Sequence, residues 1–180
     1  MVYCFLADGF EELEAIAPID MLKRAGVDVV TVGVTGKNVT GSHSVTFVAD
    51  ITADEISLTD ELQAVILPGG MPGTLNLEKN ERVQQAIDFA AESGKYICAI
   101  CAAPSILGHK GLLKGKKATA FPGFEKELEG ALADGDFVVV DGSFITAKGA
   151  GVATEFGLEI VRHLVSAEKS EEIRKTIQSR

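Results

Sequence analysis

The segment "KYICAICAAPSIL" (95–107) joins a short apolar run to a helical pattern through a few small residues. The run that ends at Ile100 has the length and composition of a buried strand. Pro104 suits the first turn of a helix, and the two alanines before it permit a sharp bend. Cys101 stands at that bend. The segment therefore predicts a strand, a tight turn and a helix, with the cysteine placed as in a nucleophile elbow.

The rest of the chain repeats this order of strand and helix. Short apolar, β-branched runs alternate with longer amphipathic segments, a pattern typical of a parallel sheet covered by helices on both faces. We expect strands at 2–7, 27–34, 64–70, 95–100 and 117–121, a strand or hairpin within 38–52, a hairpin at 137–147, and helices at 11–26, 80–94, 152–164 and 167–178. The sequence thus predicts an α/β fold, a doubly wound sandwich with a mostly parallel central sheet.

The first expected helix has a feature that bears on its orientation. Five apolar residues recur at helical spacing and are predicted to face the core: Leu13, Ile16, Ala17, Met21 and Ala25. Pro18 lies among them and removes one backbone donor, so we expect it to bend or restart the helix.

Length and composition limit the possible partners and location. A chain of 180 residues favours a single domain, 1–180. Its net charge of −9 argues against a nucleic-acid partner, because phosphate backbones require a positive surface. No apolar stretch approaches the roughly 18 residues needed to span a membrane. Three cysteines, and a start without a signal-peptide pattern, predict a reducing, cytoplasmic location.

Cys101 is the candidate nucleophile, with a buried structural cysteine as the alternative. Free N–H groups at a helix start favour thiolate, so we expect its pKa to fall below roughly 8.5. A disulfide with Cys98 is not expected, because three residues of strand span roughly 10 Å and disulfide Cα atoms lie within about 7 Å. Cys98 and Cys4 are therefore predicted to be core. The cysteines and histidines show no metal-ligand spacing, so no metal site is expected.

A carboxylate is the candidate partner for this cysteine, because Ala102, and not a histidine, follows it. Glu11, Glu12 and Glu14 stand at the start of the first helix, where acids are commonly partners of the helix dipole. Glu14 falls one residue off the apolar stripe, so it is expected to be partly buried. A half-buried carboxyl can stay protonated near neutral pH, donate a hydrogen bond to a thiolate and shuttle a proton.

Three motifs in this order resemble the ThiJ/PfpI superfamily, most closely its DJ-one branch: "FLADGFEELEAIAPIDMLKRAG" (5–26), "VILPGG" (65–70) and "AICAAPSIL" (99–107). "TAKGAGVATEFGLEIV" (146–161) is similar to the last loop and helix of that branch. The resemblance implies a flavodoxin-like sandwich, a homodimer and a cofactor-free site. By position, it implies that Cys101 is the reactive cysteine, that Glu14 hydrogen-bonds it, and that the amides of Gly70 and Ala102 point toward a bound oxyanion.

The chain departs from the family pattern at four positions. Phe121 stands where some relatives carry a histidine near the site, which disfavours a catalytic triad. His43 occupies a position where relatives have arginine, so it is a possible entrance or anion contact. Lys148 replaces another arginine, and Val152 replaces a hydroxyl residue.

Two functions from different classes follow from these residues and the resemblance. The first is an enzyme acting on a small reactive carbonyl, of the glyoxalase III or deglycase type, which converts methylglyoxal to lactate through a hemithioacetal. The second is an oxidative-stress sensor or redox-regulated chaperone in which Cys101 is oxidised to sulfinate. Thiamine-related biosynthesis lacks phosphate-binding residues, and a peptidase lacks a histidine base, so both are less favoured.

Overall fold

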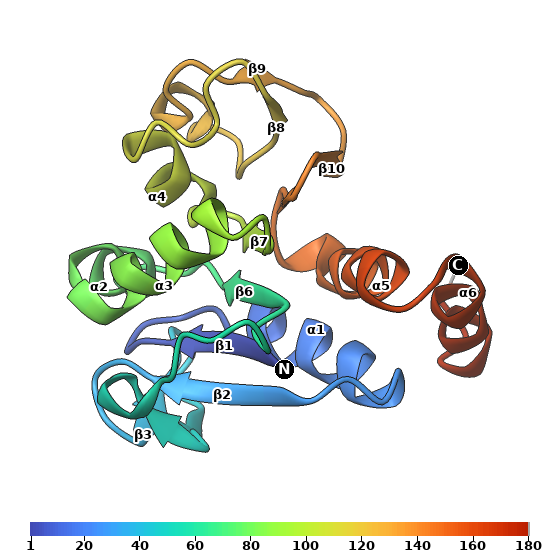
Figure 1. The fold of residues 1–180 in the computed structure, drawn as a ribbon, viewed down its shortest axis with the longest axis horizontal. Helices are drawn as coiled ribbons and strands as arrows, with labels where there is room; N and C mark the ends of the chain where they lie inside the picture. Colours follow the sequence, from blue (N-terminus) through green and yellow to red (C-terminus); the bar gives the residue numbers. More distant parts are fainter. Residues whose placement is uncertain (180) are drawn as a thin grey trace.

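The computed structural model describes residues 1–179, in which a seven-stranded sheet lies between two layers of helices (Figure 1). The strand order is β10-β11-β7-β6-β1-β2-β5, and all neighbours pair parallel except β10 with β11. The predicted α/β fold with a mostly parallel sheet is confirmed. The strands of this sheet are β1 (Val2–Leu6), β2 (Val29–Gly33), β5 (Ile51–Thr52), β6 (Ala64–Leu67), β7 (Tyr96–Ile100), β10 (Val138–Asp141) and β11 (Phe144–Ala147).

The helices form two groups, one on each face of the sheet (Figure 1). One group contains α1 (Glu12–Arg24) and α5 (Ala153–Leu164), with α6 (Ala167–Thr176) packed outside α5. The other contains α2 (Gly73–Lys79), α3 (Glu81–Glu92) and α4 (Pro104–His109). Alternate residues of β1 belong to the two cores, Cys4 on the α1 and α5 side and Phe5 on the other. Because both faces are covered, every residue of β1 is buried.

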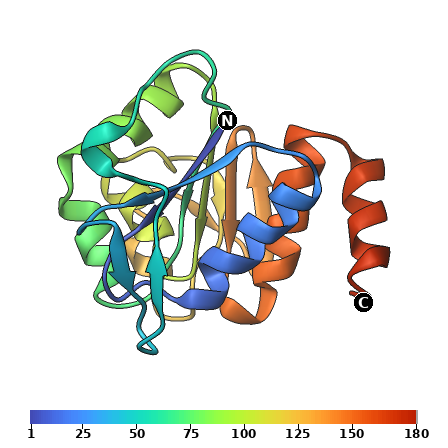
Figure 2. The same ribbon diagram turned by 90° about the horizontal axis from the view of Figure 1, so that it is seen from below.

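Smaller elements lie beyond the main sheet. A hairpin of β3 (Asn38–Thr40) and β4 (Thr46–Val48) extends past the sheet near the start of α1 (Figure 2). β8 (Lys117–Ala118) and β9 (Leu132–Ala133) form a second two-stranded sheet. The predicted turn between β10 and β11 is confirmed, with Gly142 at φ +60°. Three short 3-10 helices complete the chain: η1 (Ala53–Glu55), η2 (Glu125–Glu127) and η3 (Ala150–Val152).

The buried face of α1 differs from the predicted one. Met21 is buried as predicted, but Leu13 and Ile16 are 60% and 40% exposed, and the buried positions beside Met21 include Glu14 and Pro18. Glu14, Pro18 and Met21 recur at helical spacing and turn toward α5 and the site, so the prediction placed the core face wrongly by about one residue.

Pro18 lies inside a continuous helix, so of the two expected effects, a bend or a restart, the restart does not occur. Its place is explained by the neighbouring helix: a Cβ on Gly157 of α5 would lie only 2.7 Å from the Cα of Pro18. The two helices approach closely at this point because Gly157 has no side chain. Among the described residues, no helix is both long and apolar enough to cross a membrane.

Candidate active site

Cys101 occupies a tight turn between β7 and α4, as the sequence predicts. Its φ is +66°, in the left-handed region that residues other than glycine rarely adopt. Its N–H donates to the carbonyl of Ala147 in β11 at 2.8 Å, and its carbonyl accepts the N–H of Phe121 at 2.8 Å. Two neighbouring segments thus hold the backbone of this strained residue. Such strain persists only where the surrounding structure enforces it, and it is concentrated at functional sites.

Glu14 reaches Cys101 from the first turn of α1. The side chain is almost fully buried, with 1% of the residue exposed. Its carboxylate accepts the Cys101 thiol and the backbone N–H of Ala150, and its Oε2 accepts the N–H of Gly69 at 3.0 Å. The structure therefore brings together the two residues that the sequence analysis paired.

Gly69 explains why these two side chains can meet. A Cβ at this position would lie 2.6 Å from the Cβ of Cys101 and 2.6 Å from Oε2 of Glu14. Neither distance is possible for a real side chain, so position 69 must be glycine for the pair to form. The sequence analysis noted the two glycines after β6 but did not connect Gly69 with the pair.

Backbone amides also face the sulfur atom. The N–H groups of Ala102 and Gly70 both hydrogen-bond to the Cys101 side chain. Gly70 has a φ of +89°, and a side chain there would collide with the backbone at the start of α1. The two predicted amides are thus present at the sulfur, and their role toward an oxyanion stays a prediction.

Burial controls the protonation of Glu14. Loss of hydration raises the pKa of the Glu14 carboxyl to about 7, against the hydrogen bonds from Cys101, Gly69 and Ala150 that lower it. The negative charge of Glu11 also raises it. Glu14 can therefore exchange a proton near neutral pH, as a general acid or base must.

The expectation of a lowered pKa for Cys101 is wrong. Burial raises the pKa of the thiol to about 12, and the charge and hydrogen bond of Glu14 act in the same direction. The amides of Ala102 and Gly70 lower it only in part. Because the two groups are in contact, they titrate as a coupled pair in which the carboxylate carries the negative charge and the thiol keeps its proton.

The other two cysteines are confirmed as core residues. Cys4 and Cys98 are fully buried, and all three cysteines are free, so no C-x-x-C disulfide forms. Burial raises the pKa of both thiols. Cys101 is half-buried, and it is the only cysteine in this chain with access to solvent.

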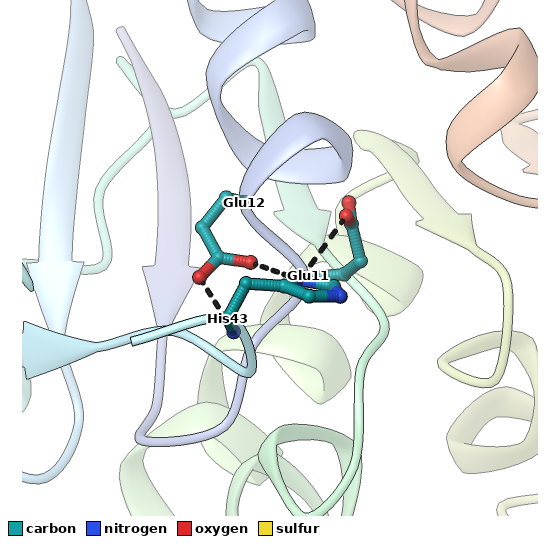
Figure 3. Close-up of side chains that lie close together, drawn as sticks. All are labelled: Glu11, Glu12 and His43. Atoms are coloured by element: carbon teal, nitrogen blue, oxygen red, sulfur yellow. Dashed lines mark hydrogen bonds and ion pairs between the residues drawn. The ribbon is translucent and has the colours of Figure 1, made fainter. Parts of the chain in front are cut away.

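His43 lies at the tip of the β3–β4 hairpin and contacts the start of α1 (Figure 3). Its Nδ1 is 2.9 Å from Oε2 of Glu12 and 3.9 Å from Oε1 of Glu11. Hydrogen bonding to Glu12 raises the pKa of His43, and the same bond helps to lower the pKa of Glu12 against the effect of its burial. Its predicted role as an entrance or anion contact stays a prediction.

Glu11, Glu12 and His43 together offer three metal-ligating atoms within 4.8 Å of one another, a grouping that sequence spacing did not indicate. Glu12 Oε1 already accepts the backbone N–H of His43 at 2.8 Å, and Oε2 pairs with the histidine ring. We interpret this cluster as the contact that fastens the hairpin to α1. It was missed because His43 lies 31 residues from Glu12.

The two remaining histidines make their contacts elsewhere. His109 lies between Glu78 and Glu127, and His163 contacts Glu159 and the ring of Tyr96. Neither has a recorded contact with Cys101 among the described residues. Phe121, whose N–H donates to the carbonyl of Cys101, is 48% exposed.

Comparison with known proteins shows which family the chain as a whole matches. Residues 1–163 match the DJ-1/PfpI family. The chain is 40% identical over 172 residues to "Protein DJ-1 homolog B" of Arabidopsis thaliana, covering 94% of this chain but only 39% of that longer protein. It is 33% identical over 160 residues to "Deglycase TK1284" of Thermococcus kodakarensis, covering 88% of this chain and 95% of that one. The solved structure "Toxoplasma gondii DJ-1, oxidized" superposes with a TM-score of 0.94 at 30% identity, covering 99% of this chain and 97% of that one.

Proposed function

The chain belongs to the DJ-1/PfpI family, and we propose that it is a cofactor-free enzyme that uses Cys101 to act on small reactive carbonyls. One observation carries this proposal: the only solvent-accessible thiol hydrogen-bonds to a buried carboxyl whose pKa is about 7. A nucleophile in contact with a tunable proton acceptor is the minimum that covalent carbonyl chemistry needs. Relatives named deglycases, at 32% and 33% identity, support an enzymatic role.

The first step is addition of the sulfur to an aldehyde such as methylglyoxal. Ionised Glu14 takes the thiol proton as the C–S bond forms and the C=O π bond breaks. The raised pKa of Cys101 is no obstacle, because the proton moves within the pair during attack and no free thiolate has to accumulate. The new oxyanion lies next to the sulfur, where the amides of Gly70 and Ala102 can stabilise it before Glu14 returns the proton.

The second step moves a proton between neighbouring carbons. Glu14 removes the hydrogen from the carbon bonded to sulfur, and the electron pair passes to the adjacent carbonyl oxygen, which gives an enediolate. Glu14 then returns this proton to the second carbon while the hydroxyl proton on the first carbon moves to the oxygen of the second, and a lactoyl thioester results. Water then cleaves the C–S bond, which releases lactate and restores the thiol. An early adduct of methylglyoxal with an amine or thiol would enter the same sequence, with release of the amine or thiol.

Lactate formation from methylglyoxal without glutathione tests the proposal. We expect turnover by the unchanged protein and a loss of at least about 100-fold in Cys101→Ser and in Glu14→Gln. Glu92→Gln, an exposed glutamate at the end of α3, is the matched control and should retain full activity. Equal rates in all four proteins would contradict the proposal.

A second candidate function, redox sensing, is favoured by the same half-buried sulfur. Two molecules of hydrogen peroxide would oxidise the Cys101 thiol to sulfinate and leave as two waters, and the negatively charged oxygens would lie beside Glu14, which can donate a hydrogen bond when protonated. The fully buried Cys4 and Cys98 are shielded from the oxidant. The two functions can share one site.

We also propose that the chain forms a homodimer through the outer face of α1. Leu13 and Ile16 are exposed there, and Val45 of the β3–β4 hairpin lines one hollow together with Leu13. A two-fold interface pairs the same patch on both chains, and burying these apolar side chains against their copies would be favourable. Light scattering after gel filtration should give the unchanged protein a mass twice that of one chain. The Leu13→Lys variant should have the mass of a single chain. Val165→Lys, an exposed valine after α5, should leave the dimer intact.

A further inference from the structure

A cavity of about 310 Å³ is bounded on one side by the loop 149–152, which also contacts Glu14. Its walls are Phe121, Pro122, Phe137, Lys148 and the loop 149–152. Phe121 and Phe137 are 48% and 66% exposed, so two aromatic rings line a hollow that no described residue fills. Burying such apolar surface against a ligand is favourable, and small-molecule sites are commonly apolar hollows of this size.

Two backbone connections tie this cavity to the reacting groups. The Phe121 N–H donates to the carbonyl of Cys101 at 2.8 Å, so the backbone of Phe121 lies next to that of the nucleophile. A Cβ on Gly149 would lie 3.3 Å from Cδ2 of Phe121 and 3.6 Å from Oε1 of Glu14. The N–H of Ala150 binds the Glu14 carboxylate. The loop that holds the proton acceptor is therefore also a wall of the cavity.

Lys148 sets the polarity of the outer end. Its Nζ donates to the carbonyl of Gly135 at 2.6 Å and lies 5.0 Å from the centre of the Phe137 ring. The ammonium is thus held against an aromatic face, which is a favourable cation–π position. This contact holds Phe137 and Lys148 together, and both residues line the cavity.

We propose that this cavity receives the substituent of the carbonyl substrate and selects α-oxoaldehydes with an aromatic or bulky apolar group over methylglyoxal. This inference rests on the proposed function, because it assigns the substrate class of the same site. A methyl group is too small to cover the two exposed rings, whereas a phenyl group in the cavity would bury more of their apolar surface. We expect a preference of about tenfold or more in kcat/KM for the aromatic substrate.

Competing turnover of phenylglyoxal and methylglyoxal tests the selectivity. Mandelate and lactate are measured for the unchanged protein, Phe137→Ala and Phe121→Ala, with Val165→Ala as an exposed control outside the cavity. Each aromatic truncation should lower the ratio of phenylglyoxal to methylglyoxal kcat/KM at least about fivefold, and the control should leave the ratio unchanged. A ratio near one in the unchanged protein, or one insensitive to both truncations, would overturn the inference while leaving the proposed enzyme in place.

A second measurement does not depend on turnover. Cys101 is alkylated with N-phenylchloroacetamide and with chloroacetamide, and mass spectrometry gives the rate for each. The C–S bond forms as the C–Cl bond breaks, chloride leaves with the bonding electrons, and the thiol proton passes to Glu14. The ratio of the alkylation rate with N-phenylchloroacetamide to that with chloroacetamide should be higher for Cys101 than for free cysteine. Phe137→Ala should lower this ratio to that of free cysteine. If neither glyoxal is turned over but Cys101 prefers the phenyl reagent, the enzymatic proposal fails, while the inference that the cavity receives an aromatic substituent stands. If Cys101 shows no preference for the phenyl reagent, the inference about the cavity fails.

Discussion

Cys101 and Glu14 meet across Gly69, whose missing side chain leaves the space in which the thiol reaches the carboxylate. The contact joins residues from the end of β7 and the first turn of α1, on either side of a glycine after β6. Three segments that are distant in sequence thus meet at the carboxyl ends of neighbouring strands, where ligand sites of open α/β sheets lie.

Gly69→Ala should separate the pair. Its Cβ would lie 2.6 Å from both Cys101 Cβ and Glu14 Oε2, so at least one group must move. We expect about a 100-fold loss of activity, because catalysis is sensitive to displacements of about 1 Å. Gly135→Ala adds the same methyl group in open space and should be neutral. Steady-state kinetics on both proteins, with circular dichroism to verify folding, measures the difference.

The pH dependence of kcat/KM should follow Glu14. Burial raises the pKa of this carboxyl to about 7, and the ionised form is the one that accepts the thiol proton. Activity should therefore rise with pH, about tenfold per unit below pH 7, and level off above it. Glu14→Gln should show a low, flat profile. A profile that levels off near the ordinary glutamate pKa of about 4.5 would contradict this assignment.

The same shift predicts how stability depends on pH. The pKa of Glu14 is about 7 in the folded chain and about 4.5 in the unfolded chain, so the folded state binds more protons between these values. The contribution of Glu14 to the free energy of unfolding is complete below about pH 4.5 and is lost as the pH rises through about 7. The total loss is about 3 kcal/mol. In urea unfolding, the free energy of unfolding of the unchanged protein should fall relative to that of Glu14→Gln as the pH rises. By about pH 8 the relative loss should reach up to that amount. If the difference between the free energies of unfolding of the two proteins does not change with pH, the pKa of Glu14 is not raised in the folded chain.

Helix packing next to the site should depend on Gly157. In Gly157→Ala the new methyl group would lie 2.7 Å from Cα of Pro18, which belongs to the backbone of α1 and cannot move freely. We expect a loss of about 1–3 kcal/mol in the free energy of unfolding. Gly151→Ala, at a position with open space, should cost much less. Denaturant titration of the two variants makes the comparison.

Mild peroxide should oxidise one cysteine selectively. Mass spectrometry is expected to find two added oxygen atoms on Cys101 and none on Cys4 or Cys98, because the latter are fully buried. Cys101→Ser should take up no oxygen at low peroxide. Oxidation of all three cysteines at similar rates would contradict the sensor hypothesis.

Much of the architecture could be predicted from the sequence, because apolar runs and amphipathic segments report directly on strands and helices. The bend at Cys101 was predictable from the small residues and the proline around it. The buried face of α1 was not, because Leu13 and Ile16 are apolar but exposed, while the acidic Glu14 is buried. The short helix α2 was missed, since its seven residues carry little periodicity.

The electrostatics of the site depend on the folded environment and could not be predicted from local sequence. The elbow suggested a low pKa for Cys101, yet burial and the neighbouring charge of Glu14 outweigh the amides of Ala102 and Gly70. The contact between His43 and Glu12 depends on how the β3–β4 hairpin folds back, and no short-range pattern indicates it. Partial burial of Glu14 was predicted, but its extent required the three-dimensional structure.

The two ends of the sheet bear on how the protein behaves at high concentration. One edge strand, β5, has only two residues. The other edge strand, β10, runs antiparallel to β11 and packs against β8, and there the Lys117 N–H donates to Oδ2 of Asp141 at 2.9 Å. A short edge and a covered edge leave few unpaired N–H and C=O groups for another chain to join. We therefore expect resistance to edge-to-edge aggregation, so that self-association stays confined to side-chain surfaces and does not extend into fibrils.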